Sequence, residues 1–259
     1  MATTDTEHDL SHFGLGIDIG GSGVKGAIVD YRTGEFASER IKIATPSPAT
    51  PEAVAAVVSE IVRGHNWDGP VGICLPSVVV NQVARTAANI DKSWIGTDVH
   101  DLFTNALGGT NVAVLNDADA AGLAEVSFGD ETARSGAVLF LTFGTGIGSA
   151  FLADGVLFPN TELGHMMIGD KEAEHLASSA AKDREELSYK KWAKRVNKVL
   201  AEYERLFNPA AFVVGGGISR NSDKWVPLLT IDTPVVPAKL RNRAGIVGAA
   251  MAARSLIQP

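Results

Sequence analysis

LGIDIGGSGVKG, at residues 15–26, places a run of glycine and serine between two short apolar segments. The flanking residues, 15–19 and 24–29, are apolar and rich in β-branched side chains, so the stretch predicts a hairpin of two strands. Glycine carries no Cβ, so backbone N–H groups at such a turn can converge on phosphate oxygens. A plain glycine-rich hairpin is the alternative. The sequence predicts a phosphate-binding turn made of Gly20, Gly21, Ser22 and Gly23.

Two charged residues flank this turn. Lys25 adds a positive charge that suits a phosphate. Asp18 is a candidate ligand of Mg²⁺, directly or through water, because hard cations prefer carboxylate oxygens. Asp18 as an ordinary turn residue is the alternative.

Residues 21–26 also match the Gly-x-Gly-x-x-Gly pattern of dinucleotide-binding proteins. That pattern requires a helix to open at the glycines, whereas residues 24–30 predict a strand. The sequence therefore argues against dinucleotide binding. It also contains no Gly-x-x-x-x-Gly-Lys-Ser/Thr stretch, which argues against a P-loop NTPase.

A second hairpin of the same design occurs about half a chain later. Gly144, Thr145 and Gly146 separate apolar runs at residues 137–143 and 147–152, and Leu141 takes the place of Asp18. The repeat predicts a duplicated α/β fold with a cleft between the halves, and clefts between domains are common ligand sites. We expect a flexible tail at 1–12, a smaller N-terminal domain at 13–116 plus 244–259, and a larger C-terminal domain at 117–243.

The remaining pattern alternates strands and helices. Thr50-Pro51 looks like a helix start, and Asp154-Gly155 looks like a hairpin turn. Alternation of apolar and polar residues predicts a strand at 36–43, and apolar runs predict strands at 71–75, 112–115 and 212–214. Helical spacing predicts helices at 51–62, 98–107, 118–128, 192–207 and 244–256.

Asn116 and Asp117 stand where a predicted strand ends and a helix begins. Functional carboxylates in open α/β sheets usually lie at the carboxyl ends of strands. Asp117 is therefore the candidate general base that takes a proton from an attacking hydroxyl, with Asn116 as a hydrogen-bonding neighbour. Helix N-capping is the alternative, since Asn and Asp both cap well. Asp119 suits the helix dipole.

Four further polar or flexible groups are candidates for ligand contacts. Glu162 can accept hydrogen bonds from sugar hydroxyls, and His165 can donate or accept them, although a lone histidine is often structural. Glu174 is a weaker candidate, because a solvated helix residue explains it equally. The expected strand 212–214 is followed by Gly215, Gly216 and Gly217. A base or ribose could lie against these glycines; a tight strand-to-helix connection is the alternative.

The composition is that of an ordinary globular protein, with 45% hydrophobic and 20% charged residues among 259. The net charge of -7 argues against a nucleic-acid binder driven by bulk charge. Residues 182–198 are nevertheless net basic and could guide a long polyanion, or form a solvated helix face. Cys74 is the only cysteine, which excludes an intrachain disulfide and a cysteine-rich zinc cluster and fits the cytosol. We expect no secretory signal, membrane span or membrane partner.

The motifs together resemble the ROK family (repressors, open reading frames and kinases), sugar kinases of the actin-like ATPase superfamily. The resemblance runs from about residue 14 to 256 and rests on the two glycine turns, Asn116-Asp117, ELGH at 162–165 and VGGG at 214–217. Segments 15–26, 86–94 and 115–122 are similar to the polyphosphate-dependent glucokinases of actinobacteria within the family.

This resemblance implies duplicated actin-like ATPase (ribonuclease H-like) domains and transfer of a phosphoryl group to the 6-hydroxyl of glucose. Polyphosphate or ATP would be the donor, with Mg²⁺ as cofactor, and homodimers are common in the family. Asp117 would be the base, and Asp18, Lys25 and the first turn would take the transferring phosphate, with Gly144, Thr145 and Gly146 taking the others. The implied sugar contacts are Asn89, Asn116, Asp117, Glu162, His165 and Glu174.

Two departures from the family pattern matter. Many members carry a cysteine-rich zinc motif after the Gly-His pair, but residues 166–190 contain no cysteine. We therefore expect no zinc and a sugar contact, not a metal ligand, at His165. The repressors carry an N-terminal helix-turn-helix, for which the 14 residues before the first strand leave no room, so we expect no nucleic-acid partner.

Two other functions remain open from the sequence. One is an ATP-only kinase of glucose, mannose or an amino sugar, although the zinc-free segment argues against amino sugars. The other is a non-catalytic sugar-sensing or actin-like ATP-binding module, which would need no acceptor base.

Overall fold

The computed structural model describes residues 12–255 and residue 259. Most of the expected tail at 1–12, and Leu256 at the end of the expected last helix, lie outside these residues. The chain divides into two compact units, unit 1 (Met1–Ala120 and Gly245–Pro259) and unit 2 (Ala121–Ala244). The boundaries expected from the sequence, 116 and 243, lie close to these. No helix among the described residues combines the length and apolarity needed to cross a membrane.

Unit 1 is built on a sheet in the order β3-β2-β1-β5-β8, with β4 also paired to β2. β1 and β2 are antiparallel, whereas β1, β5 and β8 run parallel. Its strands are β1 (Phe13–Gly20), β2 (Gly23–Asp30), β3 (Glu35–Phe36), β4 (Ile41–Ile43), β5 (Val71–Leu75) and β8 (Val112–Asn116), with a small ribbon of β6 (Val79–Val80) and β7 (Val83–Ala84). Its helices are α1 (Pro51–Gly64), α2 (Val99–Ala106), the start of α3 (Asp117–Phe128) and α7 (Ala244–Ser255).

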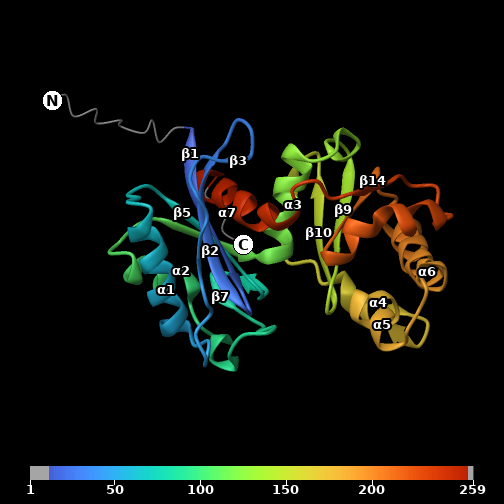
Figure 1. Ribbon diagram of the computed structural model, residues 1–259, viewed down its shortest axis with the longest axis horizontal. Coiled ribbons are helices and arrows are strands. Elements are labelled where there is room, and N and C mark those ends of the chain that lie inside the picture. Colours follow the sequence, from blue (N-terminus) through green and yellow to red (C-terminus); the bar gives the residue numbers. More distant parts are fainter. Residues whose placement is uncertain (1–11, 256–258) are drawn as a thin grey trace. The chain divides into compact units, whose positions relative to one another are not determined.

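The helices of unit 1 cover both faces of this sheet (Figure 1). Leu15 and Ile17 of β1 share a buried cluster with residues of α1 and α2. The alternate residue Gly16 faces α7, because a Cβ there would lie 1.9 Å from the Ile246 carbonyl oxygen. Alternation along a strand thus assigns one face to each set of helices.

Unit 2 repeats the design with a sheet in the order β11-β10-β9-β14-β15. In both sheets the first three strands form an antiparallel meander and the last two join in parallel. The strands are β9 (Ala137–Phe143), β10 (Ile147–Ala153), β11 (Val156–Phe158), β14 (Ala211–Gly215) and β15 (Val235–Pro237), with a ribbon of β12 (Met167–Ile168) and β13 (Lys171–Glu172). This shared order confirms the predicted duplicated α/β fold.

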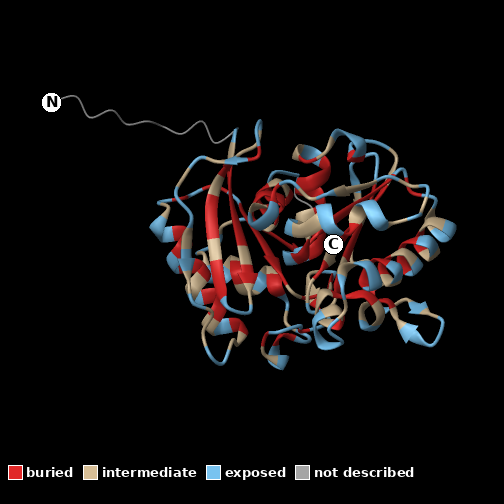
Figure 2. Ribbon diagram, turned by 45° about the vertical axis from the view of Figure 1, so that its right-hand side comes forward, coloured by how far each residue is buried: buried red, intermediate tan, exposed pale blue. Residues whose placement is uncertain are grey.

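Helices also pack on both faces of the second sheet. Gly122 of α3 lies against Ala150 and Leu152 of β10, while α6 packs on the opposite face beside Leu139 and Leu141. Figure 2 shows buried residues concentrated in the strands and on the inner sides of the helices. The helices are α4 (Ala173–Ala177), α5 (Ser179–Arg184), α6 (Tyr189–Phe207) and the 3₁₀ helices η2 (Glu131–Ala133), η3 (Leu163–His165), η4 (Gly217–Lys224), η5 (Val226–Leu228) and η6 (Arg241–Arg243), with η1 (Lys92–Trp94) in unit 1.

One expected strand is wrong in its extent. Residues 36–43 do not form one strand but divide into β3 and β4. Between them the Ser38 hydroxyl accepts a hydrogen bond from the Ile28 backbone N–H at 2.9 Å, where continuous pairing would use a backbone carbonyl. The other strands and helices expected from the sequence are present, and β5 and β9, for example, have the expected ends, whereas α4, α5 and β15 were not predicted.

Candidate active site

The carboxyl ends of three parallel strands carry the candidate residues of unit 1. Asp18 of β1 lies in register with Cys74 of β5, and Cys74 with Leu115 of β8. Asn116 and Asp117 follow Leu115 directly. Parallel register therefore brings Asp18 and the Asn116-Asp117 pair to one edge of the sheet, where such folds bind ligands.

Asp18 and Lys25 face each other across the first hairpin. They are register partners in β1 and β2, and the Lys25 Nζ lies 3.0 Å from the Asp18 Oδ2. Both side chains are about three-quarters buried, with exposed fractions of 22% and 25%. Gly20 pairs with Gly23, so Gly21 and Ser22 form the tip of the turn. The turn thus carries a cation and a carboxylate at its base.

Asn89 lies beside this turn, although nothing in its local sequence predicts that position. A Cβ on Gly21 would lie 3.2 Å from the Asn89 carbonyl oxygen. Asn89 has a φ of 60°, in the left-handed region that Asn tolerates better than most residues. Asn89 and the first glycine turn therefore belong to one surface of unit 1.

The first turn of α7 also packs against Asp18. A Cβ on Gly245 would lie 3.5 Å from the Asp18 Cγ. Helix N-termini favour negative charge, so this helix supports a carboxylate or phosphate at that edge. Sequence analysis missed Gly245; the available signal was a glycine inside an apolar helical pattern.

Cys74 fills the space behind Asp18. Its Sγ lies 3.8 Å from the Asp18 Oδ1 and 3.6 Å from the Gly245 carbonyl oxygen. Complete burial, followed by the negative charges of Asp18 and Asp117, raises the pKa of the thiol well above its usual value. Cys74 therefore stays a neutral packing residue at physiological pH.

Asn116 acts as the N-cap of α3. Its Oδ1 accepts hydrogen bonds from the N–H groups of Ala118 (2.8 Å) and Asp119 (3.3 Å), and its Nδ2 donates to the Ser77 carbonyl at 3.1 Å. Its side chain thus does what the capping interpretation expects. Asp117 is exposed, and its Oδ1 accepts from the Ala118 N–H at 2.8 Å. The cap holds the Asp117 backbone in place at the strand end.

In unit 2, Glu174 lies against the second glycine turn. The Ile147 N–H donates to the Glu174 Oε2 at 3.3 Å, and a Cβ on Gly146 would lie 2.3 Å from the same oxygen. Gly164 packs as closely, because a Cβ there would lie 2.2 Å from the Ile147 carbonyl oxygen. These two glycines let the carboxylate and the segment at 162–165 approach the turn.

His165 lies between two carboxylates. Its Nδ1 is 3.1 Å from the Glu172 Oε2, and its Nε2 is 3.7 Å from the Glu162 Oε2. The hydrogen bond to Glu172 raises the pKa of His165 and lowers that of Glu172. Burial raises the pKa of Glu162. Sequence analysis missed Glu172; its signal was an acidic residue two positions before Glu174.

One ring nitrogen of His165 and one carboxylate oxygen each of Glu172 and Glu174 all lie within 4.8 Å of one another. The structure thus groups three of the side chains that could contact a sugar. The sugar-contact role of His165 stays a prediction. Within unit 2 the cluster of Glu162, His165, Glu172 and Glu174 adjoins the second glycine turn through Glu174.

The third glycine group also meets the second turn. Gly215 of β14 is in register with Thr142 of β9. Gly216 has a φ of 84°, and a Cβ there would lie 2.4 Å from the Phe143 carbonyl oxygen. Both facts require glycine at 216. Gly144 and Gly217 have nothing within 4 Å of an added Cβ, so these backbones face open space.

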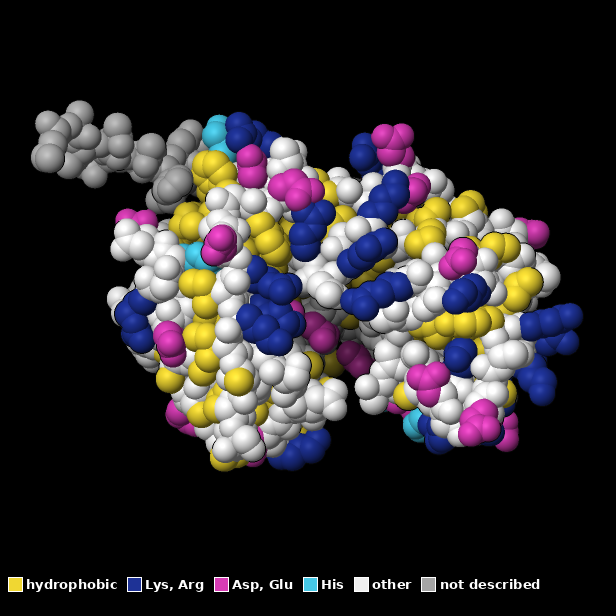
Figure 3. Space-filling view, in the orientation of Figure 1, with side chains coloured by type: hydrophobic (Ala, Val, Ile, Leu, Met, Phe, Trp, Pro, Cys, Tyr) yellow, Lys and Arg dark blue, Asp and Glu magenta, His cyan; other side chains and the backbone are white. Residues whose placement is uncertain are grey.

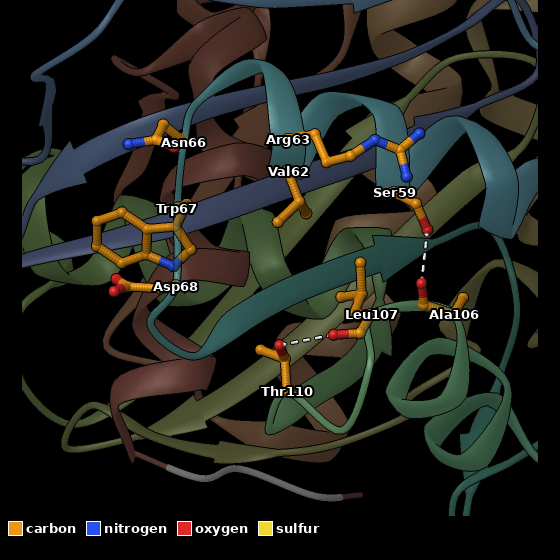
Figure 4. Close-up of a pocket in the computed structure, with 9 residues that line it drawn as sticks. All are labelled: Ser59, Val62, Arg63, Asn66, Trp67, Asp68, Ala106, Leu107 and Thr110. Atoms are coloured by element: carbon orange, nitrogen blue, oxygen red, sulfur yellow. Dashed lines mark hydrogen bonds between the residues drawn. The ribbon is translucent and has the colours of Figure 1, made fainter.

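A separate pocket of about 430 Å³ in unit 1 contains none of these residues (Figure 4). Its hydroxyl groups already bond within the protein: Ser59 donates to the Ala106 carbonyl and Thr110 to the Leu107 carbonyl, each near 3 Å. We assign it no part in the candidate site. Its lining is Ser59, Val62, Arg63, Asn66, Trp67, Asp68, Ala106, Leu107 and Thr110.

Replacing Glu172 by Gln should lower the pKa of His165 toward its ordinary value of 6.5. The pair stabilises the protonated ring below pH 6.5, and that contribution is lost as the pH rises through the raised pKa. NMR titration of the His165 ring measures the shift, with His100 of α2 in unit 1 as an internal control. An unchanged His165 pKa in E172Q would show that Glu172 does not hold the proton.

Comparisons with known proteins identify the family of the chain. The ROK family model matches residues 14–176. The chain is 57% identical over 239 residues to the polyphosphate glucokinase of Mycobacterium tuberculosis strain H37Rv, covering 92% of this chain and 90% of that protein.

Two solved structures share the fold. The inorganic polyphosphate/ATP-glucomannokinase from Arthrobacter sp. strain KM has a TM-score of 0.85 and 47% identity, covering 94% of this chain and 98% of that one. The ROK family glucokinase from Streptomyces griseus, solved with glucose and AMPPNP, has a TM-score of 0.77 and 25% identity, covering 94% and 99%. With its two matching sheets and its ordered motifs, the chain belongs to the ROK family.

Proposed function

We propose that the protein is a glucokinase that transfers the terminal phosphoryl group of inorganic polyphosphate, and of ATP, to the 6-hydroxyl of glucose. The observation that carries this proposal is the register that brings Asp18, beside its glycine turn and Lys25, to the same sheet edge as Asp117. A phosphate cradle and an acceptor base at one edge are the parts a sugar kinase needs. The 57% identity to a polyphosphate glucokinase supports polyphosphate as donor.

In the proposed reaction one proton is transferred, one bond to phosphorus forms and one bond to phosphorus breaks. The Asp117 carboxylate takes the proton of the 6-hydroxyl as its oxygen attacks the terminal phosphorus. The bond from that phosphorus to the bridging oxygen breaks, and a polyphosphate shortened by one unit, or ADP, leaves. Glu162, His165 and Glu174 hold the sugar, together with Asn89 and Asn116. Closure over the sugar would exclude water, which otherwise competes as acceptor.

The residues at Asp18 fit Mg²⁺. Asp18 offers a carboxylate oxygen beside a glycine turn, and Mg²⁺ is usually bound by one or two carboxylates, waters and substrate phosphates. Bound there, the ion would neutralise charge on the donor phosphates. Lys25 and the first turn take the transferring phosphate, and the second and third turns take the phosphates or nucleotide that follow.

The test is glucose 6-phosphate formation by the purified protein with Mg²⁺, comparing long-chain polyphosphate with ATP at matched phosphoryl concentration. We expect product with both donors. Product with ATP alone would remove polyphosphate from the proposal and favour the ATP-only kinase. No product from glucose with either donor would contradict it and point to another sugar or to a binding module.

The basic segment 182–198 is proposed as a track for polyphosphate. Part of its charge is compensated, since Lys182, Arg184 and Arg195 pair with Asp183 or Glu185. Four lysines of α6 are exposed to solvent. Figure 3 shows Lys and Arg side chains at the edge where Figure 1 places α6. The four exposed lysines are Lys190, Lys191, Lys194 and Lys198.

Changing these lysines of α6 to Gln should raise the KM for long-chain polyphosphate several-fold and leave the KM for ATP within about twofold. A long polyanion gains from each cation along its path, whereas ATP has only three phosphates. Steady-state kinetics with both donors measure the difference. Equal losses with polyphosphate and ATP would contradict the track.

We also propose a homodimer that works in the cytoplasm. A buried, unpaired Cys74 fits a reducing compartment. Light scattering of the purified protein measures the oligomeric state, and a monomer mass would contradict the dimer.

A further inference from the structure

Two lysine side chains lie within cation–π distance of one tyrosine ring in unit 2. The Lys182 Nζ lies 4.8 Å from the ring centroid of Tyr189, and the Lys224 Nζ lies 5.6 Å from it. Lys182 belongs to α5, Lys224 ends η4, and Tyr189 begins α6. Both distances are within cation–π range. Three separate elements therefore converge to gather two like charges.

The partners of these lysines leave the group positively charged. The Lys182 Nζ is 3.3 Å from the Asp183 Oδ1, on a side chain that is 72% exposed. The Lys224 Nζ donates to the Asn221 Oδ1 at 3.0 Å, which is a neutral acceptor. Like charges repel, and a tyrosine ring attracts each cation only weakly. An anion at this place would relieve the repulsion.

The same elements lead back to the glycine turns proposed for phosphates. The Ala180 N–H, at the start of α5, donates to the Gly144 carbonyl at 3.1 Å. η4 begins at Gly217, immediately after Gly216 packs on Phe143. Lys182 thus lies two residues after the residue that bonds to the second turn, and Lys224 ends the 3₁₀ helix that begins at the third turn.

A group of buried aromatic side chains packs beside this connection. The Trp225 ring lies 4.9 Å from Trp192 and 5.9 Å from Phe143, measured between centroids. The Trp192 Nε1 donates to the Ala177 carbonyl at 3.0 Å, just before α5. Phe143 precedes the second turn, and Trp225 follows Lys224. The aromatic group therefore ties the lysine pair to the turn.

We propose that Lys182 and Lys224, held over Tyr189, bind the phosphates of the polyphosphate donor that follow those held by the glycine turns. This inference rests on the proposed function and extends it to a place that the basic segment alone does not include, since Lys224 lies outside residues 182–198. The ammonium groups already occupy the ring of Tyr189, so a nucleotide base would have to displace them to stack there. The ring therefore offers no stacking surface to a base, which favours polyphosphate over ATP as the ligand of this pair.

The test is the double variant K182Q/K224Q. We expect its KM for long-chain polyphosphate to rise about tenfold, with the KM for ATP within about twofold and kcat with ATP unchanged. The dependence of the polyphosphate KM on salt should also become shallower, because two cation–phosphate contacts are lost. Calorimetry of polyphosphate binding without glucose provides a readout separate from activity.

Two further variants control the experiment. R134Q/R205Q removes two exposed positive charges from the same unit and should keep wild-type kinetics. Y189F keeps the ring face and should behave as wild type, whereas Y189L removes it and should resemble K182Q/K224Q in part.

An unchanged polyphosphate KM and affinity in K182Q/K224Q would overturn the inference while leaving a polyphosphate-active glucokinase in place. Equal increases in KM for both donors would also overturn it, because they would indicate damage to the shared turns. A wild-type protein that neither binds nor uses polyphosphate, but phosphorylates glucose with ATP, would overturn the inference together with the proposed donor.

Discussion

Replacement of Asp117 by Asn should lower kcat for glucose phosphorylation by about 10³-fold with either donor, since general-base catalysis contributes roughly 10²–10⁴-fold. Asparagine has the size of aspartate but cannot take the proton of the 6-hydroxyl. Its Oδ1 can still accept the Ala118 N–H, so the start of α3 should be preserved. Glucose binding, measured by calorimetry, should persist. Coupled detection of glucose 6-phosphate measures the loss of rate.

An exposed acid elsewhere in unit 1 provides the control. D68N removes one negative charge beside Trp67 and should leave kcat within about twofold. A D117N protein that keeps more than about a tenth of the wild-type kcat would show that Asp117 is not the base. A wild-type protein that binds glucose but transfers no phosphoryl group to it would favour the non-catalytic module.

Replacement of Gly72 by Ala should lower the free energy of unfolding by about 3 kcal/mol, at the upper end for overpacking of a core. A Cβ there would lie 1.7 Å from the Ala249 carbonyl oxygen and 2.3 Å from its carbon. These are backbone atoms of α7, so the helix itself must move away from the sheet. Urea denaturation followed by circular dichroism measures the change.

The same displacement should reach the site. The first turn of α7 holds Gly245 against Asp18, so a shifted helix withdraws its N-terminus from the phosphate edge. We therefore expect G72A to lower activity as well as stability. G64A is the matched control, because a Cβ at Gly64 meets only the flexible end of Ile41, at 2.8 Å. Equal stability of G72A and wild type would contradict the close packing of α7 on the sheet.

Local patterns predict most of this fold. The hairpin of β1 and β2, the run of β5 and the helix that starts at Pro51 each depend on residues within one short segment. Thr50 accepts a hydrogen bond from the Ala53 N–H, as its place before Pro51 predicts. The interrupted strand at 36–43 shows the limit, because a Ser38 hydroxyl replaced a backbone partner.

The candidate site was predictable only where its residues stand next to a local signal. Asp18 and Lys25 flank a glycine turn, and Asn116-Asp117 stands at a strand–helix junction. Glu172 has only the nearby acid Glu174 as a signal, Gly245 has only its place in an apolar helical pattern, and Lys224 has none. Gly245 and Lys224 contact partners that are far away in the chain and are brought near by packing. The spacing of residues in the sequence does not predict such contacts.

The sequence by itself determined where strands and turns form, that the design is repeated, and which residue types stand at each turn. Backbone freedom at glycine and the period of apolar side chains are properties of a few neighbouring residues, so they can be read locally. Only the tertiary structure decided which of these residues meet. Parallel register placed Asp18 beside Cys74 and Cys74 beside Leu115, and helix packing placed Gly245 on Asp18. Such contacts depend on the summed packing of a whole sheet and its helices, which no single segment contains.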